Sequence, residues 1–182
     1  MTLLSLQGVA CLRGGRLLFE GLDLTLGPGA AALVHGPNGV GKSSLIRIAA
    51  GLLRAAAGRV ERSEAALADE HLALDERQTL GRALAFWAGD PTPGILGMGL
   101  ERLTDVPVRM LSTGQRKRAT LARVIASRAP LWLLEEPGNG LGADGLAALE
   151  AAIATHRTTG GAVLVATHQP LALPDAALVT LA

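Results

Sequence analysis

The residues whose types and spacing point most directly to chemistry form one glycine-rich stretch, Gly36-Pro37-Asn38-Gly39-Val40-Gly41-Lys42-Ser43. This stretch fits the pattern G-x-x-x-x-G-K-[ST] of a phosphate-binding loop. In such a loop, backbone N–H groups surround an anion at the N-terminus of a helix. Lys42 would reach the terminal phosphates and Ser43 would bind Mg²⁺. The predicted nucleotide-binding residues are Gly36, Pro37, Asn38, Gly39, Val40, Gly41, Lys42, Ser43 and Ser44.

The residues on either side of this loop separate a real phosphate site from a chance glycine-rich turn. Residues 31–35, of which the first four are apolar, predict a short buried strand before the loop. After the loop, apolar residues recur with helical spacing, at Leu45, Ile48, Ala49 and Leu52. A strand, a loop and a helix in this order are what the motif requires, so we favour the functional interpretation.

A second candidate site is a pair of acidic residues, Glu135 and Glu136, directly after the apolar run 131–134. Acidic residues at the carboxyl end of a buried strand lie where open α/β sheets bind their ligands. Glu135 is predicted to bind Mg²⁺, and Glu136 to orient and deprotonate a water molecule that attacks a phosphate. The alternative is a strand that ends in two solvated acids, which the presence of the phosphate-binding loop makes improbable.

The third candidate is the segment Ser112-Thr113-Gly114-Gln115 at the start of an apolar-faced helix. Ser112 and Gln115 have the spacing of a capping box, and Gly114 permits close approach of another backbone. A helix N-terminus with an exposed hydroxyl group can receive a phosphate. Composition alone does not exclude that this segment is only a helix cap.

The elements that must position these residues predict an α/β fold with a parallel sheet covered on both faces. Short apolar runs in residues 3–26 predict an N-terminal antiparallel β-layer. We expect one domain over 1–182, with its core in residues 1–70 and 129–182 and a helical subdomain in about 71–128. Within that subdomain, Phe86 is expected in a small core and Trp87 at an interface with a partner.

The overall composition limits the classes of partner. The chain has 182 residues and a net charge of +1, which gives no electrostatic reason to expect a nucleic-acid partner. Its mean hydropathy is +0.34, but its apolar runs are far shorter than the roughly 18 residues of a membrane span. We see no secretory signal, and the single cysteine, Cys11, fits a reducing compartment and a small core residue.

The order of these motifs resembles that of ABC-type ATPases, and the resemblance covers essentially the whole chain. It implies a fold with a RecA-like parallel sheet core and the cofactors ATP and Mg²⁺. It also implies a head-to-tail dimer, a homodimer or a pairing with a related subunit, in which Ser112, Thr113, Gly114 and Gln115 of one copy close over ATP held by the other. His168, after the apolar run 162–166, would contact the γ-phosphate and the attacking water.

Three further segments, 12–22, 84–89 and 167–171, are similar to the haem-exporter ATP-binding subunits of cytochrome c maturation, the CcmA-like family. That resemblance implies integral-membrane partner subunits and a peripheral location on the cytoplasmic side of the inner membrane. ATP hydrolysis would then drive haem export or the release of a haem-loaded chaperone. An ABC exporter for another substrate is the same-class alternative.

The sequence departs from the ABC pattern at four positions. Glu135 replaces the usual aspartate of the Mg²⁺ site, and Gly142 replaces an aspartate expected at the dimer contact. His71 stands where a loop glutamine is usual, either as a ligand of Mg²⁺ through water or as a surface residue. No aromatic residue near Arg13 is available to stack on adenine. The changes at Glu135 and Gly142 motivate a further alternative, a non-hydrolytic ATP-gated clamp.

Overall fold

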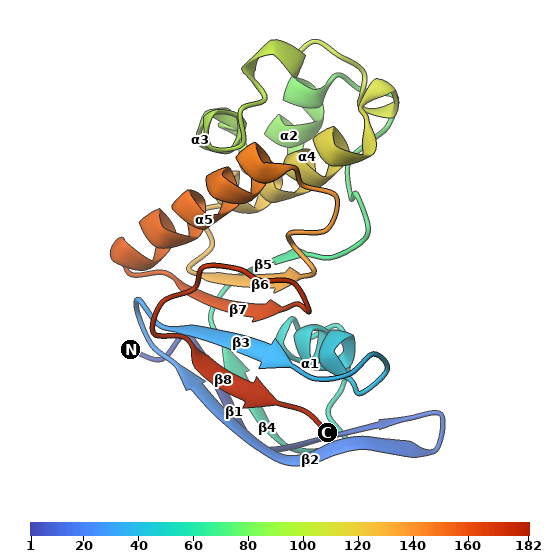
Figure 1. Cartoon of the computed structure of the whole chain (residues 1–182), viewed down its shortest axis with the longest axis vertical. Coiled ribbons are helices and arrows are strands. Elements are labelled where there is room, and N and C mark those ends of the chain that lie inside the picture. Colours follow the sequence, from blue (N-terminus) through green and yellow to red (C-terminus); the bar gives the residue numbers. More distant parts are fainter.

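The computed structural model describes residues 1–182 and contains a five-stranded parallel sheet with the strand order β5-β6-β7-β3-β8 (Figure 1). Its central strands are almost entirely apolar and buried, as expected of a parallel sheet covered on both faces. The strands are β3 (Ala31–His35), β5 (Ala65–Ala68), β6 (Leu131–Glu135), β7 (Ala162–Ala166) and β8 (Ala177–Thr180).

The N-terminal layer is a second, antiparallel sheet with the order β2-β1-β4, made of β1 (Leu4–Arg13), β2 (Arg16–Leu26) and β4 (Ala57–Arg62). The expected antiparallel layer is therefore present. It consists of two long strands and β4, rather than of the short runs read from the sequence. Gly8 and Gly21 lie inside these strands with φ of +57° and +64°, and the β1–β2 register shifts beside them. Such glycines mark bulges, which the sequence alone presents as breaks between strands.

Two hydrophobic cores lie on opposite faces of the parallel sheet. Because neighbouring side chains of a strand point to opposite faces, Leu131 and Leu133 belong to one core, and Trp132 and Leu134 belong to the other. The first core is completed by α1 (Lys42–Ala49) and the antiparallel layer.

The second core lies under the helices that follow β5 in the chain (Figure 1). These elements are α2 (Leu80–Ala88), α3 (Thr92–Gly97), the short 3₁₀ turns Glu101–Leu103 and Val108–Met110, α4 (Thr113–Ala126) and α5 (Ala143–Thr158). Helix α4 contacts β5 and α5 contacts β7, so the helical region is anchored directly on the sheet.

The structure corrects three expectations. Strand β5 was not predicted, because Ala65–Ala68 is rich in alanine and becomes a strand only by pairing with β6. Leu52 is not on the buried face of α1, since that helix ends at Ala49 before Gly51, whose φ is +73°. Phe86 is not in a core either, because it is 81% exposed on α2.

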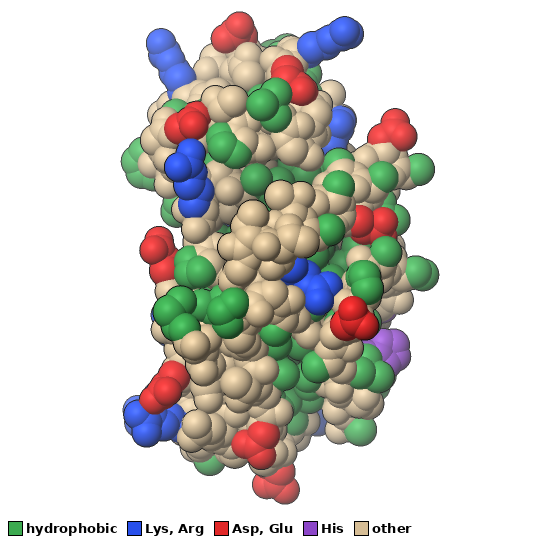
Figure 2. Space-filling model, turned by 90° about the vertical axis from the view of Figure 1, so that its left-hand side faces the viewer, with side chains coloured by type: hydrophobic (Ala, Val, Ile, Leu, Met, Phe, Trp, Pro, Cys, Tyr) green, Lys and Arg blue, Asp and Glu red, His purple; other side chains and the backbone are tan.

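The outer surface carries hydrophobic and charged side chains side by side. On the face shown in Figure 2, hydrophobic side chains form small separate groups between acidic and basic ones. None of the helices combines the length and the apolar character that crossing a membrane requires.

Candidate functional site

The glycine-rich loop connects β3 to α1, as the sequence predicted. Gly36 has a φ of +151°, and a Cβ atom at this position would lie 2.5 Å from the carbonyl oxygen of Leu181. Only glycine fits that position. Gly41, with a φ of +119°, is the N-cap of α1, and no side chain caps this helix. The positive end of the helix dipole therefore faces the loop, where it favours an anion.

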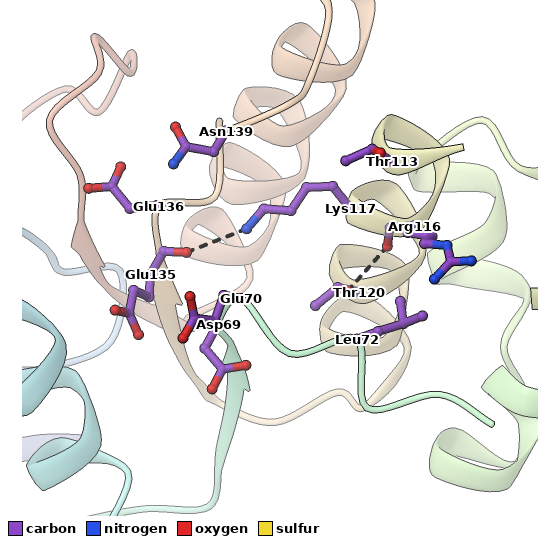
Figure 3. Close-up of a pocket in the computed structure, with 10 residues that line it drawn as sticks. All are labelled: Asp69, Glu70, Leu72, Thr113, Arg116, Lys117, Thr120, Glu135, Glu136 and Asn139. Carbon is purple, nitrogen blue, oxygen red and sulfur yellow. Dashed lines mark hydrogen bonds between the residues drawn. The ribbon is translucent and has the colours of Figure 1, made fainter. Parts of the chain in front are cut away.

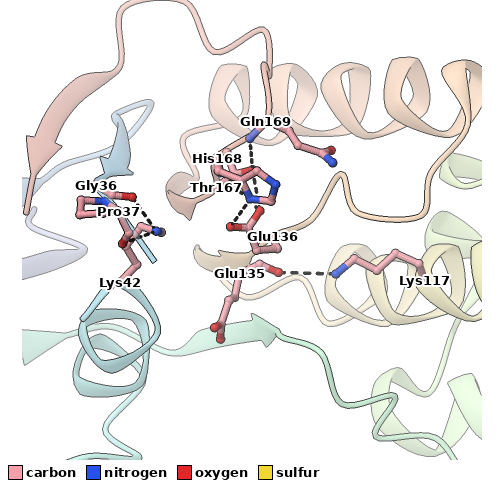
Figure 4. Close-up of polar contacts among 9 residues, drawn as sticks. All are labelled: Gly36, Pro37, Lys42, Lys117, Glu135, Glu136, Thr167, His168 and Gln169. Carbon is pink, nitrogen blue, oxygen red and sulfur yellow. Dashed lines mark hydrogen bonds and ion pairs between the residues drawn. The ribbon is translucent and has the colours of Figure 1, made fainter. Parts of the chain in front are cut away.

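Lys42 lies with its side chain folded back over the loop. Its Nζ donates hydrogen bonds to the carbonyl oxygens of Gly36, at 2.7 Å, and of Pro37, at 3.0 Å (Figure 4). Lys42 is only 9% exposed, which is unusual for a lysine and reflects these two bonds. An ammonium group is thus fixed inside the predicted phosphate site.

A cavity of about 400 Å³ lies beside the loop and brings the predicted nucleotide and metal residues together. Glu135 and Glu136 line it from the end of β6, and Leu18 lines it from β2. Leu18 was not singled out from the sequence, because an isolated leucine in a strand carries no functional signal. The loop residues that line the cavity are Asn38, Gly39, Gly41, Lys42, Ser43 and Ser44.

Glu136 is held by residues that follow the neighbouring strand β7. Its Oε1 is 2.9 Å from Nδ1 of His168, and its Oε2 accepts a hydrogen bond of 2.9 Å from the Thr167 hydroxyl group (Figure 4). The backbone N–H of His168 also donates to Oε2, at 3.4 Å. The structure therefore brings the predicted pair Glu136 and His168 into direct contact and adds Thr167, which the sequence did not reveal.

Two opposing effects set the pKa of Glu136. Burial raises it, but the hydrogen bonds from His168 and Thr167 together outweigh burial, so the pKa lies below the ordinary value for glutamate. Glu136 is accordingly a carboxylate at neutral pH and can accept a proton.

Glu135 has a different environment. It is half-buried, and its Oε2 is shielded from solvent without a hydrogen-bond partner within the chain. A buried polar atom without a partner is costly unless a ligand satisfies it. Together with Ser43 in the same cavity, this oxygen supplies the oxygen-donor chemistry that Mg²⁺ prefers. The residues present therefore fit a Mg²⁺ site.

His71 lies apart from these residues. Its side chain is exposed, and its Nδ1 is 3.1 Å from a carboxylate oxygen of Asp69. His71 lines neither the phosphate-loop cavity nor a second cavity beside it, which lies between α4 and the ends of β5 and β6. Asp69 follows β5 and shares that neighbouring cavity with Glu135. Asp69 could not be singled out from the sequence, because β5 itself was not recognisable.

The neighbouring cavity has about the same volume, 400 Å³, and lies between α4 and the ends of β5 and β6 (Figure 3). Its lining combines acidic side chains with two basic ones and few apolar ones. The residues are Asp69, Glu70, Leu72, Thr113, Arg116, Lys117, Thr120, Glu135, Glu136 and Asn139.

Ser112 begins α4 with a complete capping box. Its hydroxyl group accepts from the Gln115 N–H at 3.3 Å, and its own N–H donates to the Gln115 side chain at 2.9 Å. Ser112, Gly114 and Gln115 line a third cavity of about 320 Å³, together with Gly142. No residue of this third cavity lines the phosphate-loop cavity.

Comparison with known proteins agrees with this geometry. The family described as ABC transporter matches residues 19–139. The structure is similar to a solved ATP-binding subunit of an ABC transporter, with a TM-score of 0.82 and 22% identity, over 92% of this chain and 80% of that one.

Two relatives share much more sequence. Both carry the name cytochrome c biogenesis ATP-binding export protein CcmA. The one from Sphingopyxis alaskensis is 60% identical over 95% of this chain and 93% of the relative. The one from Zymomonas mobilis is 48% identical over 94% of this chain and 81% of the relative. This chain therefore belongs to the ABC transporter family, and within it to the CcmA group of ATP-binding proteins.

Proposed function

We propose that this chain is the ATP-hydrolysing subunit of an ABC export complex that acts in cytochrome c biogenesis. The observation that carries the proposal is the contact between Glu136 and His168 at the edge of the phosphate-loop cavity. A general base must be ionised and within reach of the water, and the contact with His168 keeps Glu136 a carboxylate next to the phosphate site.

The phosphate-binding loop and the acidic pair have distinct roles in this proposal. The loop amides and Lys42 bind the phosphates of ATP, and Glu136 is the general base for the attacking water. His168 orients Glu136 and contacts the γ-phosphate. Ser43 and Glu135 would hold Mg²⁺, which supplies neutralisation of the phosphate charge. His71 has no place in this arrangement beyond its exposed contact with Asp69.

A complete site would need two copies of the chain. The signature residues 112–115 line cavities other than the phosphate-loop cavity of their own chain. Residues Ser112 and Gly114 of one copy would close over ATP held by residues 36–43 of the other, which makes the functional unit a homodimer. Gly142, which lines the same cavity as Ser112, would then lie close to the contact between the copies.

The complex would also contain integral-membrane subunits, because the relatives are named as ATP-binding export proteins. The name of the relatives places them in cytochrome c biogenesis as export proteins. On that basis we propose a peripheral position on the cytoplasmic side of the inner membrane, with ATP hydrolysis driving haem export or the release of a haem-loaded chaperone.

The substitution Glu136→Gln tests the enzymatic part. It keeps the size of the side chain but removes the base, so ATP hydrolysis should fall by at least about 100-fold while ATP binding is retained. The nucleotide-bound variant should also accumulate as a closed dimer, measurable by light scattering. Hydrolysis at the parent rate would show that Glu136 is not the base.

Two further measurements separate the alternatives. If the parent chain with its membrane subunits shows no phosphate release at saturating Mg·ATP, the protein is an ATP-gated clamp. If cells that carry only the Glu136→Gln chain still assemble c-type cytochromes normally, the exporter serves another substrate.

A further inference from the structure

The peptide group between Glu135 and Glu136 is held at both ends by different elements. The N–H of Glu136 donates a hydrogen bond of 2.7 Å to the carbonyl oxygen of Ala166, at the end of β7. The carbonyl oxygen of Glu135 accepts a long hydrogen bond, 3.5 Å, from Nζ of Lys117 on α4 (Figure 4). Rotation of this one peptide plane would move both carboxylates, so the two bonds together fix their directions.

The backbone at this point needs such support. Glu136 has a φ of +44°, a left-handed conformation that residues with side chains rarely adopt. Strained conformations of this kind persist only where the surroundings determine them. Ala166 supports the Glu136 side of the peptide, and Lys117 is the residue that supports the Glu135 side.

The side chain of Lys117 crosses the neighbouring cavity from α4 toward the end of β6 (Figure 3). Burial lowers the pKa of Lys117, and the carboxylates of Asp69, Glu136 and Glu135 oppose that shift. The neighbouring carboxylates offset the cost of burying the ammonium group of Lys117 and so favour its observed position.

The second basic residue of this cavity, Arg116, is engaged elsewhere. Its guanidinium group donates to Glu76 and to the backbone oxygens of Leu111 and Arg109. Arg116 is therefore directed to the segment before α4, and Lys117 is the basic residue of this cavity that reaches the Glu135–Glu136 peptide.

Helix α4 is joined to the parallel sheet by two basic side chains. Arg123, near the end of the helix, donates to the carbonyl oxygen of Leu67 in β5. Lys117, close to the signature residues, reaches β6 beside Glu136. Only the second of these bonds ends at a predicted catalytic or metal-binding residue.

We propose that Lys117 is a positioning residue, which holds the Glu135–Glu136 peptide and transmits the position of the signature end of α4 to both carboxylates. Its consequence for catalysis rests on the proposed function. The structural part does not, because it concerns only the hydrogen bond between α4 and β6.

The test uses the full chain with its membrane subunits and the variants Lys117→Met and Lys117→Arg. Methionine keeps much of the length and apolar volume but cannot donate a hydrogen bond, whereas arginine can donate to the same carbonyl group. Arg102→Met, at an exposed residue of the 3₁₀ turn Glu101–Leu103, is a control for the loss of one positive charge.

For Lys117→Met we expect kcat to fall by roughly 10- to 100-fold while the Kd for Mg·ATP changes less than about twofold, because binding is retained and geometry is lost. Lys117→Arg should recover kcat to within about threefold of the parent, since its fork can reach the same oxygen. Arg102→Met should behave as the parent.

Amide hydrogen exchange supplies a readout that does not depend on activity. In Lys117→Met the Glu136 amide should exchange at least about tenfold faster than in the parent, while the melting temperature changes little. An unchanged exchange rate at Glu136 would overturn the proposal. So would a parallel loss of melting temperature and Mg·ATP affinity, because that pattern marks a purely structural lysine. If the parent chain does not hydrolyse ATP, the proposed function fails while the exchange measurement still decides the role of Lys117.

Discussion

Glu136 and His168 touch through Oε1 and Nδ1 at 2.9 Å, although 32 positions separate them in the sequence. Each residue closely follows the end of a buried strand, Glu136 after β6 and His168 after β7. Because these strands are parallel neighbours, their carboxyl ends open onto the same edge of the sheet. The pairing of the two strands thus creates the contact on which the proposed chemistry depends.

The first prediction concerns the pH dependence of hydrolysis. His168 and Thr167 keep the pKa of Glu136 below its ordinary value, against the opposing effect of burial. In His168→Ala burial acts with less opposition, so this pKa should rise. The rate should then begin to fall at a higher pH on acidification than in the parent, and kcat at neutral pH should drop by about 100-fold.

The measurement is kcat at saturating ATP over the range from about pH 3.5 to pH 8, which extends below the ordinary pKa of glutamate. Thr167→Val provides a graded comparison, because it removes one hydrogen bond to Glu136 and leaves His168 in place. It should move the acid limb in the same direction by a smaller amount. An acid limb that stays in place in both variants would mean that Glu136 does not set it.

The second prediction concerns the shared site. The variant Lys42→Ala lacks the lysine that binds phosphate, and the variant Ser112→Arg has its signature cavity filled. In a homodimer of either variant both ATP sites contain the altered residue, so each homodimer should be inactive. A mixed dimer contains one site made from an intact loop and an intact signature. Random mixing should therefore restore about a quarter of the parent activity.

The mixing experiment compares ATP hydrolysis of each variant alone with that of an equimolar mixture after exchange of subunits. Activity of the mixture equal to the mean of the separate variants would contradict a head-to-tail site. Thermal melting of each variant alone serves as the folding control, since Ser112→Arg also removes a helix cap worth about 1 kcal/mol.

The third prediction concerns stability rather than catalysis. His156 stacks on Trp132 with ring centroids 3.8 Å apart and an angle of 7° between the rings. Burial lowers the pKa of His156, and hydrogen bonds to the backbone of Ala162 and Pro130 oppose this only in part. As the pH falls below the unfolded-state pKa of about 6.5, the unfolded chain gains a proton that the folded chain resists.

The chain should therefore lose stability between about pH 6.5 and the lowered pKa of His156, and the loss should level off below that value. His156→Phe keeps an aromatic ring on Trp132 but cannot be protonated, so it should show a weaker fall in melting temperature on acidification. His35→Gln, at the exposed end of β3, should retain the slope of the parent. An unchanged slope in His156→Phe would show that another group causes it.

The phosphate-binding loop, the acidic pair and the capping box could be predicted from the sequence, because each depends on residues close together in the chain. Strand β5 and the cavity behind Glu135 could not be predicted, because they arise from pairing and packing between distant segments. Ala65–Ala68 has no strand preference of its own and is extended only beside β6. Phe86 was misjudged for a related reason, since hydrophobicity alone does not tell whether a helix face is covered.

Thr167 and Lys117 show the same limit within the site. A threonine after a strand and a lysine in a basic trio are common surface residues, and nothing in their local sequence distinguishes them. Their roles become visible only when β7 and α4 are placed beside Glu136 and Glu135.

Strands β6 and β7 pair residue for residue from Leu131 with Ala162 to Glu135 with Ala166. The residues that directly follow the two strands, Glu136 and Thr167, are joined by a hydrogen bond. A single-residue insertion or deletion inside either strand would turn its side chains to the opposite faces and separate the two residues. The long connection through α5 has no such restriction at its exposed end, near residues 159–160. Variation in length among related chains should therefore occur in that connection and be absent from these two short strands.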